Sequence, residues 1–167
     1  VKDKILAVPS DNLFRWTMKN LGEVQIKGIE TTLQAEFCFF KECMLLPAIN
    51  YTFQQALDRS PDVNRNNQLI PYAPKHTASV TASVQYKNFT LNYNLLYTGK
   101  RIFDYTVKGS LPAWNSSDTG IRYHIRRENK EFVLGLEINN LFDKQYQVVK
   151  NYPMPGRSFR LNGSFRF

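Results

Sequence analysis

Apolar and polar residues alternate along most of this chain. The final stretch shows the alternation most clearly, because Phe159, Leu161 and Phe165 share one parity and polar residues lie between them. A period of two is the repeat of a β-strand with one apolar and one polar face. The pattern therefore predicts an all-β chain of antiparallel strands, at residues 1–9, 22–39, 43–55, 77–86, 89–98, 113–125, 131–139 and 157–167.

The second of these strands changes its apolar parity partway along. Val24 and Ile26 lie on one parity. From Ile29 onward the apolar residues, Leu33 among them, lie on the other. The change falls at Gly28, and a glycine accommodates an extra residue in a strand more easily than any other residue. We therefore expect a β-bulge at Gly28.

The clearest hairpin in the sequence spans residues 77–98. A two-residue turn at 87–88 would pair Tyr86 with Phe89 and place Val84 opposite Leu91. In that register the apolar residues of both strands meet on one face and the polar residues meet on the other. The sequence thus predicts the register of this hairpin as well as its existence.

The connections between the predicted strands alternate in length. Three are short turns, at residues 40–42, 87–88 and 126–130. Four are long, at residues 10–21, 56–74, 99–112 and 140–156. Strands of about nine to sixteen residues exceed the five or six usual in soluble sheets. Long strands with alternating short and long connections are typical of a transmembrane β-barrel, in which every backbone group must pair.

The two faces of such a barrel would meet different surroundings. The face rich in Phe, Tyr, Val and Leu would contact lipid, and the face of Thr, Ser, Asn and Arg would line a wet lumen. A soluble β-sandwich also has alternating strands, but the strand length and the continuous bulky apolar face favour the barrel. We expect the long connections to be extracellular, and the C-terminus and short turns to be periplasmic.

Composition adds two exclusions. The 167 residues are 43% hydrophobic, but mean hydropathy is −0.42 and no apolar run approaches the ~18–20 residues of a transmembrane helix. The net charge of +8 comes from scattered cations, which favours a solvated basic surface over a nucleic-acid partner. Aromatic residues reach 14%, which is high for a soluble domain. Those at strand ends would suit the interfacial girdles of a membrane barrel; they are Phe39, Tyr86, Phe89, Tyr97 and Phe167.

The sequence offers no catalytic or metal-binding constellation. Cys38 and Cys43 have no histidine near them in sequence, and we expect them on opposite faces of the sheet, where a disulfide would need a bulge. His76 and His124 are more consistent with separate wall positions. No Ser, His and acid set shares one face, so an outer-membrane hydrolase is disfavoured. We expect neither an enzyme nor a cofactor.

Several segments carry a resemblance to a known family. Asn139–Tyr146 reads N-N-L-F-D-K-Q-Y, Tyr152–Phe159 reads Y-P-M-P-G-R-S-F, and the last residue is Phe167. Upstream, Asn20–Glu30 reads N-L-G-E-V-Q-I-K-G-I-E. In this order the segments resemble the C-terminal region of TonB-dependent outer-membrane receptors. The resemblance covers nearly the whole chain.

The resemblance implies that residues 1–167 are the C-terminal segment of a transmembrane β-barrel in the outer membrane of a Gram-negative bacterium. The segment would be about the last third of a 22-stranded barrel, with the plug domain absent from this chain. The implied function is active uptake of a scarce ligand. The runs W-T-M-K-N-L-G-E-V and V-V-K-N-Y-P-M-P-G-R-S-F are most similar to cobalamin receptors, and ferric siderophore or haem receptors are the alternative.

The same resemblance implies a set of partners. These are outer-membrane lipid, the remainder of the receptor, the TonB complex acting through the plug, the barrel-assembly machinery and possible contact with a surface lipoprotein. The terminal Phe165 and Phe167 resemble the mark that the assembly machinery recognises. Their position at the end of a lipid-facing strand explains them equally well.

Two groups of residues are candidates for function. The candidate ligand contacts are loop residues with aromatic or charged tips, namely Trp16, Arg59, Arg65, Arg101, Tyr105 and Trp114. The charged residues expected to face the lumen, where they could solvate, pair across strands or dock the plug, are Arg122, Glu137, Arg160 and Arg166.

A function of another class stays open at this point. About eight strands could close alone as a complete structural or adhesin barrel. Closure would require residues 1–8 to pair with the last strand. That first segment resembles the end of a strand whose beginning is missing, and it is too short to pair along all of 157–167.

Overall fold

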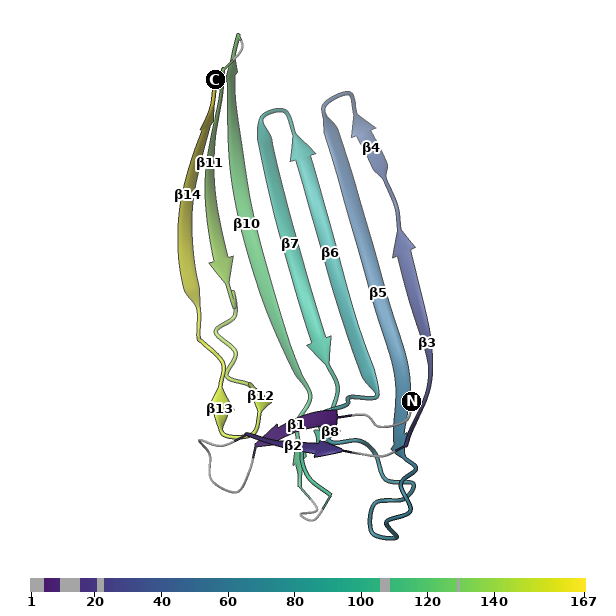
Figure 1. Cartoon of the computed structure of the whole chain (residues 1–167). Coiled ribbons are helices and arrows are strands. Elements are labelled where there is room, and N and C mark those ends of the chain that lie inside the picture. The colour runs from purple at the N-terminus through teal and green to yellow at the C-terminus, as the bar shows by residue number, and fades with distance from the viewer. Residues whose placement is uncertain (1–4, 10–15, 21–22, 106–108, 129) are drawn as a thin grey trace.

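The computed structural model is built around one large antiparallel sheet, which we call the wall (Figure 1). The structure describes residues 5–9, 16–20, 23–105, 109–128 and 130–167. Within these ranges it contains no helix with the length and apolar character needed to cross a membrane. In spatial order the wall consists of β14 (Ser158–Arg166), β11 (Lys130–Asn139), β10 (Trp114–Arg127), β7 (Phe89–Thr98), β6 (His76–Tyr86), β5 (Cys43–Asp58) and β3 (Val24–Gln34), with β4 (Phe37–Phe40) also paired to β5.

The alternation of the sequence sets the register of the wall. Tyr86 pairs with Phe89 and Val84 pairs with Leu91, which confirms the predicted β6–β7 hairpin. The last strand pairs with β11. Adjacent residues then point to opposite faces. The polar face carries Asn50, Asn92 and Glu137, and the apolar face carries Ile49, Leu91 and Leu136.

The apolar face stays largely open to its surroundings. Leu161 is 78% exposed and Ile29 is 67% exposed, although both are large and apolar. Exposed apolar patches of this extent mark a surface that meets another apolar medium or a partner. On β6 and β7, every apolar-face residue from Ala78 to Tyr86 and from Phe89 to Tyr97 is uncharged.

The predicted bulge at Gly28 is wrong. The pairing of β3 with β5 runs without a register shift through all the paired residues of β3. Val24 lies on the polar face because it packs with Ala56 and Ile70 in a small core beneath the connection 59–75, where it is only 1% exposed. A Cβ at Gly28 would lie 2.5 Å from the carbonyl oxygen of Phe53, so the glycine serves a close approach of two backbones.

The bulge lies instead near the turn between β4 and β5. Cys38 pairs with Met44, and the register shifts before Phe40 pairs with Cys43. Cys43 and Met44 are consecutive, so the two cysteines lie on opposite faces, as predicted, and both thiols are free.

A proline explains why β3 and β4 are separate. The carbonyl oxygen of Pro47 accepts the N–H of Ala35 at 3.1 Å. An antiparallel pair of this kind normally exchanges two hydrogen bonds, and proline has no N–H to return the second. The strand is therefore interrupted at residues 35–36, opposite this proline.

The long connections gather at one end of the wall, which we call the loop end, and the short turns and the C-terminus lie at the other, the turn end (Figure 1). This confirms the predicted alternation. Three short antiparallel strand pairs lie at the loop end among the described residues. They are β1 (Ile5–Pro9) with β2 (Trp16–Asn20), β8 (Arg101–Ile102) with β9 (Ser110–Leu111), and β12 (Gln147–Val149) with β13 (Tyr152–Pro153).

The first predicted strand does not join the wall. Residues 5–9 pair with β2, inside a segment that the sequence predicted as a loop, because five residues are too few to show a clear period of two. Among the described residues, β14 pairs with β11 alone and no ladder joins β14 to β1 or β3. In the part of the chain that the structure describes, the sheet is therefore open at both edges and does not close as an eight-stranded barrel.

Candidate functional site

The polar face of the wall presents a continuous row of hydrogen-bonding side chains. Ser83 of β6 lies opposite Asn92 of β7, and Asn92 lies opposite Gly120 of β10. Gly120 lies opposite Glu137 of β11. Glu137 in turn lies opposite Arg160 on the last strand. One row of the ladder thus crosses five strands with polar or small residues only, as a water-filled interior requires.

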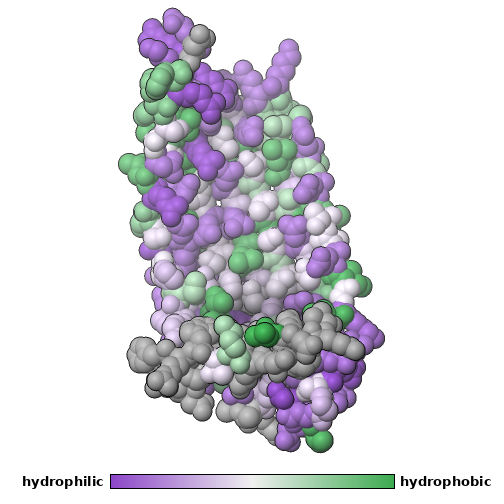
Figure 2. All heavy atoms as spheres, in the orientation of Figure 1, coloured by the Kyte–Doolittle hydropathy of each residue, from purple (hydrophilic) through white to green (hydrophobic). Residues whose placement is uncertain are grey.

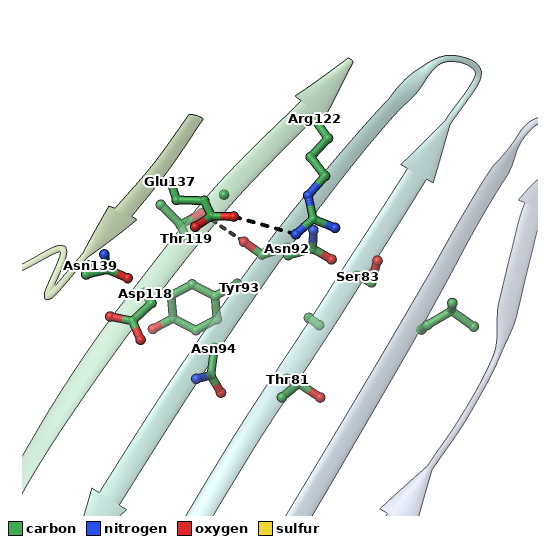
Figure 3. A pocket seen from close by; sticks show the side chains of 13 residues that line it. Thr81, Ser83, Asn92, Tyr93, Asn94, Asp118, Thr119, Arg122, Glu137 and Asn139 are labelled. Atoms are coloured by element: carbon green, nitrogen blue, oxygen red, sulfur yellow. Dashed lines mark hydrogen bonds and ion pairs between the residues drawn. The ribbon is translucent and has the colours of Figure 1, made fainter. Parts of the chain in front are cut away.

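A cavity of about 480 Å³ lies on this face (Figure 3). Its lining comes from β5, β6, β7, β10 and β11, and Gly120 contributes no side chain to it. Polar side chains from four strands point into it, among them Thr81, Ser83, Asn94, Asp118, Glu137 and Asn139. The cavity is open and can accept a polar surface or a small polar molecule.

Glu137 is the charged centre of this region. Its carboxylate lies 3.6 Å from Nη2 of Arg122 and 3.7 Å from Nη1 of Arg160. It also accepts a hydrogen bond from Nδ2 of Asn162 at 3.3 Å. The two arginines are 49% and 70% exposed, so each pair stabilises the wall by only about 0–1 kcal/mol. The structure brings together three of the four charged residues predicted to face the lumen.

The fourth, Arg166, belongs to a different part of the wall. It lies opposite Glu131 in register, close to the turn end, and is exposed. Glu131 binds Arg126 at 2.9 Å and His124 at 3.2 Å. Among the residues that the structure covers, Arg166 has no ion pair. His124 is thus a wall residue, as the sequence suggested.

Sequence reasoning put the uncharged members of the polar face on the correct parity but did not select any of them as a candidate site residue. Thr32 donates to Oδ1 of Asn50 at 2.9 Å, and Nδ2 of Asn50 donates to Ser79 at 3.1 Å, so a hydrogen-bonded chain crosses three strands. Each of these residues sits on the polar parity of its strand. That parity was the signal that would have identified them individually.

At the loop end, Arg101 holds two connections together. It is only 5% exposed, and its Nη2 donates to the carbonyl oxygens of Gln147 at 2.7 Å and Val148 at 2.8 Å. Burial lowers the pKa of Arg101, because a desolvated cation is less favourable. This candidate ligand contact is therefore committed to the protein's own backbone.

Two further contacts join these connections to each other and to the connection 59–75. The N–H of Tyr72 donates to the carbonyl oxygen of Ile102 at 2.8 Å, which attaches the connection 59–75 to β8. The ammonium of Lys150 lies 4.1 Å from the centre of the Phe103 ring, a cation–π geometry. Three long connections thus form one interlocked group.

Arg59 and Arg65 lie in the connection 59–75 and donate hydrogen bonds to residues of this connection and of β3. Arg59 donates from Nε and Nη2 to Oε1 of Gln25, at 3.1 and 2.6 Å, and from Nη1 to Asn67. Arg65 donates to Asp62 at 2.8 Å. The pKa of the Asp62 carboxyl lies below its ordinary value. The main cause is the hydrogen bond from the backbone N–H of Asn64, and the second is the hydrogen bond from Arg65.

Tyr105 lies against the small core beneath these loops. It packs on the cluster that contains Val24, Ala56 and Ile70. Burial, and then the nearby carboxyl of Asp58, raise the pKa of Tyr105. The side chain of Trp16 lies outside the described residues, so only its backbone position in β2 is known.

Trp114 is the candidate that faces a groove. Its ring stacks on Tyr146 with centroids 4.3 Å apart and planes at 19°. The groove measures about 410 Å³ and is lined also by Pro112, Gln145 and Pro153. Within the described part of the chain, Nε1 of Trp114 is buried and has no hydrogen-bond acceptor. An aromatic pair that borders a groove of this size can contact a planar ligand.

The N-N-L-F-D-K-Q-Y segment has a structural explanation. Asn140 is buried, accepts the N–H of Lys144 at 2.9 Å and donates to the carbonyl oxygen of the same residue, which closes a tight turn. Asp143 accepts the N–H of Arg157 at 2.8 Å. A Cβ at Gly156 would lie 2.8 Å from this Asp143 oxygen. The segment therefore fixes the start of β14.

In the described ranges, no three or more His, Cys, Asp or Glu side chains gather in a way that could hold a metal ion.

Comparison with known proteins identifies the architecture. The family model described as "TonB dependent receptor-like, beta-barrel" matches residues 1–141. A vitamin B12 transporter, BtuB, from Photobacterium profundum is 28% identical over 152 residues, which are 91% of this chain and 23% of that protein. The chain thus spans about a quarter of the length of the curated relatives it matches.

Solved structures share the fold. The ferric preacinetobactin receptor BauA from Acinetobacter baumannii superposes with a TM-score of 0.71 at 19% identity, over 97% of this chain and 25% of that one. The ferric citrate transporter FecA gives 0.70 at 17% identity, over 95% of this chain and 26% of that one. The open wall is accordingly a partial barrel. The chain belongs to the TonB-dependent receptors, and its strands are part of their outer-membrane β-barrel.

Proposed function

We propose that this chain is part of a transporter that takes up cobalamin actively across the outer membrane. The observation that carries the choice of ligand is the similarity, over 91% of the chain, to a vitamin B12 transporter. In this proposal residues 1–167 supply C-terminal strands of the barrel. The plug domain and the TonB-binding segment belong to parts of the receptor outside this chain.

A ferric siderophore is the second candidate ligand. The solved structures that share the fold include receptors for ferric preacinetobactin and ferric citrate. Their identities of 19% and 17% carry the fold and not the ligand, so this candidate ranks below cobalamin.

The proposed ligand contact is the groove beside Trp114. A corrinoid is broad and planar, and the Trp114–Tyr146 stack offers an aromatic surface at the edge of the groove. Four of the other candidates act indirectly, because they hold the loops that shape the mouth; these are Arg59, Arg65, Arg101 and Tyr105.

The polar face has a separate proposed role. In a closed barrel the cavity around Glu137 would face inward, where exposed arginines at positions 122 and 160 can pair with a plug. The exposed Phe165 and Phe167, with ring centroids 5.9 Å apart, are the proposed contact for the barrel-assembly machinery. A surface lipoprotein would have to bind at the loop end.

The test uses the full receptor that contains this segment. Equilibrium binding of cyanocobalamin and of ferric siderophores to the purified receptor decides the ligand, and tight binding of cyanocobalamin alone is expected. Trp114→Ala should weaken cyanocobalamin binding about tenfold or more through loss of one stacking surface. Trp114→Phe should restore much of that affinity, since it keeps a ring on Tyr146. Absence of cobalamin binding to the intact receptor would remove this proposal.

A further inference from the structure

Two like charges face each other on the apolar face at the tip of the β10–β11 hairpin. Arg127 pairs directly with Lys130 in the antiparallel register, and both side chains are exposed. Like charges directly opposite each other destabilise a strand pair. This hairpin extends beyond the neighbouring turns (Figure 1), and hydrophilic side chains gather around its tip (Figure 2). An anion from outside the hairpin would therefore stabilise the pair.

The acids nearby do not supply that anion. Glu131 points to the polar face, where its carboxylate already binds Arg126 at 2.9 Å and His124 at 3.2 Å. Glu128 is exposed in the turn, where its backbone adopts φ 51°. Among the described residues, neither Arg127 nor Lys130 forms an ion pair with a carboxylate.

The surface directly beside the two cations is apolar. Ile125 pairs with Phe132 one step along the same face, and Phe132 pairs with Phe165 on the last strand. Further along, Tyr123 packs on Phe89 with ring centroids 4.6 Å apart. An unpaired double positive charge thus borders an exposed apolar and aromatic face. Such a surface is complementary to an amphiphile with an anionic head and hydrocarbon tails.

We propose that this hairpin binds an anionic phospholipid. The phosphate sits between the Arg127 guanidinium and the Lys130 ammonium, and the acyl chains lie along Ile125, Phe132 and Phe165. Arginine contributes a planar fork that matches phosphate oxygens, and lysine adds a point charge beside it. The bound lipid removes the repulsion between the two cations and so stabilises the hairpin tip. This inference concerns the surrounding membrane and is independent of the transported ligand.

The experiment measures lipid retention by the full receptor in a neutral detergent. Native mass spectrometry follows the titration of phosphatidylglycerol, with phosphatidylcholine of the same acyl chains as the reference lipid. Each cation near an anionic lipid is worth about fivefold in affinity, so R127Q/K130Q should weaken phosphatidylglycerol binding by about 20-fold and leave phosphatidylcholine unchanged. K130E places a carboxylate opposite Arg127, which favours the folded hairpin, and should weaken phosphatidylglycerol binding at least as much.

The matched control is R166Q. Arg166 is an exposed cation near the turn end, but it lies on the polar face, and its removal should leave phosphatidylglycerol binding within about twofold. Equal losses in R166Q and R127Q/K130Q would overturn the proposal, as would wild-type binding in both hairpin variants. Displacement of the lipid by millimolar inorganic phosphate would also overturn it, because the site would then recognise a free anion.

Discussion

The wall and the loop end of this protein are stabilised in different ways. In the wall, regular ladders carry the structure, and the ion pairs around Glu137 are exposed and individually weak. At the loop end the ladders are only two to five residues long, and the buried Arg101 joins segments more than forty residues apart. The effect of a substitution on stability should thus depend on which face of the sheet the residue occupies in the wall. At the loop end it should depend on the contacts that the side chain makes.

The largest expected effect tests the two faces of the wall. Leu91→Arg places a charge on the apolar face of β7, two residues from the midpoint of the uncharged band, and should cost up to the ~2–4 kcal/mol of a cation at the bilayer midplane. Asn92→Arg places the same charge one residue away on the polar face and should cost less than about 1 kcal/mol. Urea unfolding of the receptor in lipid measures both. Equal losses would mean that the two faces meet the same environment.

The next effect concerns backbone approach within the wall. Gly28→Ala puts a Cβ 2.5 Å from the carbonyl oxygen of Phe53 and should destabilise the receptor by about 1–3 kcal/mol. Gly163→Ala is the control, because the atom nearest to its Cβ, Cδ2 of Leu134, would lie 3.9 Å away. The same unfolding measurement applies, and a neutral Gly28→Ala would show that β3 and β5 can separate without cost.

A change of similar size should stay confined to the loop end. Arg101→Met leaves the carbonyl groups of Gln147 and Val148 without their donor, a loss of about 1–3 kcal/mol in local stability. Hydrogen exchange should quicken at residues 147–150 and in β8, while the wall keeps its protection. Arg59→Met is the matched control, and its effect should be restricted to the neighbourhood of Gln25 and Asn67. Faster exchange throughout the wall would contradict the separation of the two regions.

A smaller effect is expected for the charged centre of the wall. Glu137→Gln keeps an acceptor for Asn162 but removes the charge that faces two arginines. The loss should be about 0–1 kcal/mol at low salt and should fade at high salt, since these pairs are exposed and screened. Unfolding at both ionic strengths tests this, and a salt-independent loss above 2 kcal/mol would be inconsistent with weak surface pairs.

The smallest effect is a pH dependence at the loop end. The pKa of Asp62 lies below its ordinary value of 3.8, so its contacts favour the folded loop above that pH and are lost as pH falls through the lower, folded-state pKa. Hydrogen exchange of residues 62–68, corrected for the intrinsic rate, should be faster in Asp62→Asn than in the wild type at pH 5. The difference should shrink below pH 3.8, and a constant difference would argue against a role for the charge.

The wall was predictable because its physics is local. A strict period of two fixed the pairing of Tyr86 with Phe89 and put Glu137 on the face that it occupies. The alternation gave a wrong prediction at Val24, where it indicated a bulge. Apolar residues can also be buried on the polar face where a loop covers them.

The loop end was predictable only in its location. Nothing in the local pattern relates Arg101 to two backbone carbonyls in a distant connection, or predicts that the five residues of β2 pair with β1. Choosing Arg59, Arg65 and Arg101 by charge and loop position therefore found residues that hold the loops. Whether Trp114 contacts a ligand depends on a groove that only the folded chain shows.

The uncharged stretch on β6 and β7 has a consequence for the membrane itself. The nine positions from Ala78 to Tyr86, at about 3.4 Å per residue and a strand tilt of about 40°, span only ~20–25 Å of bilayer. That is thinner than an average hydrocarbon core of about 30 Å and matches the thin bacterial outer membrane. In a thicker bilayer the lipid would have to compress around this wall, so the receptor should partition away from such regions.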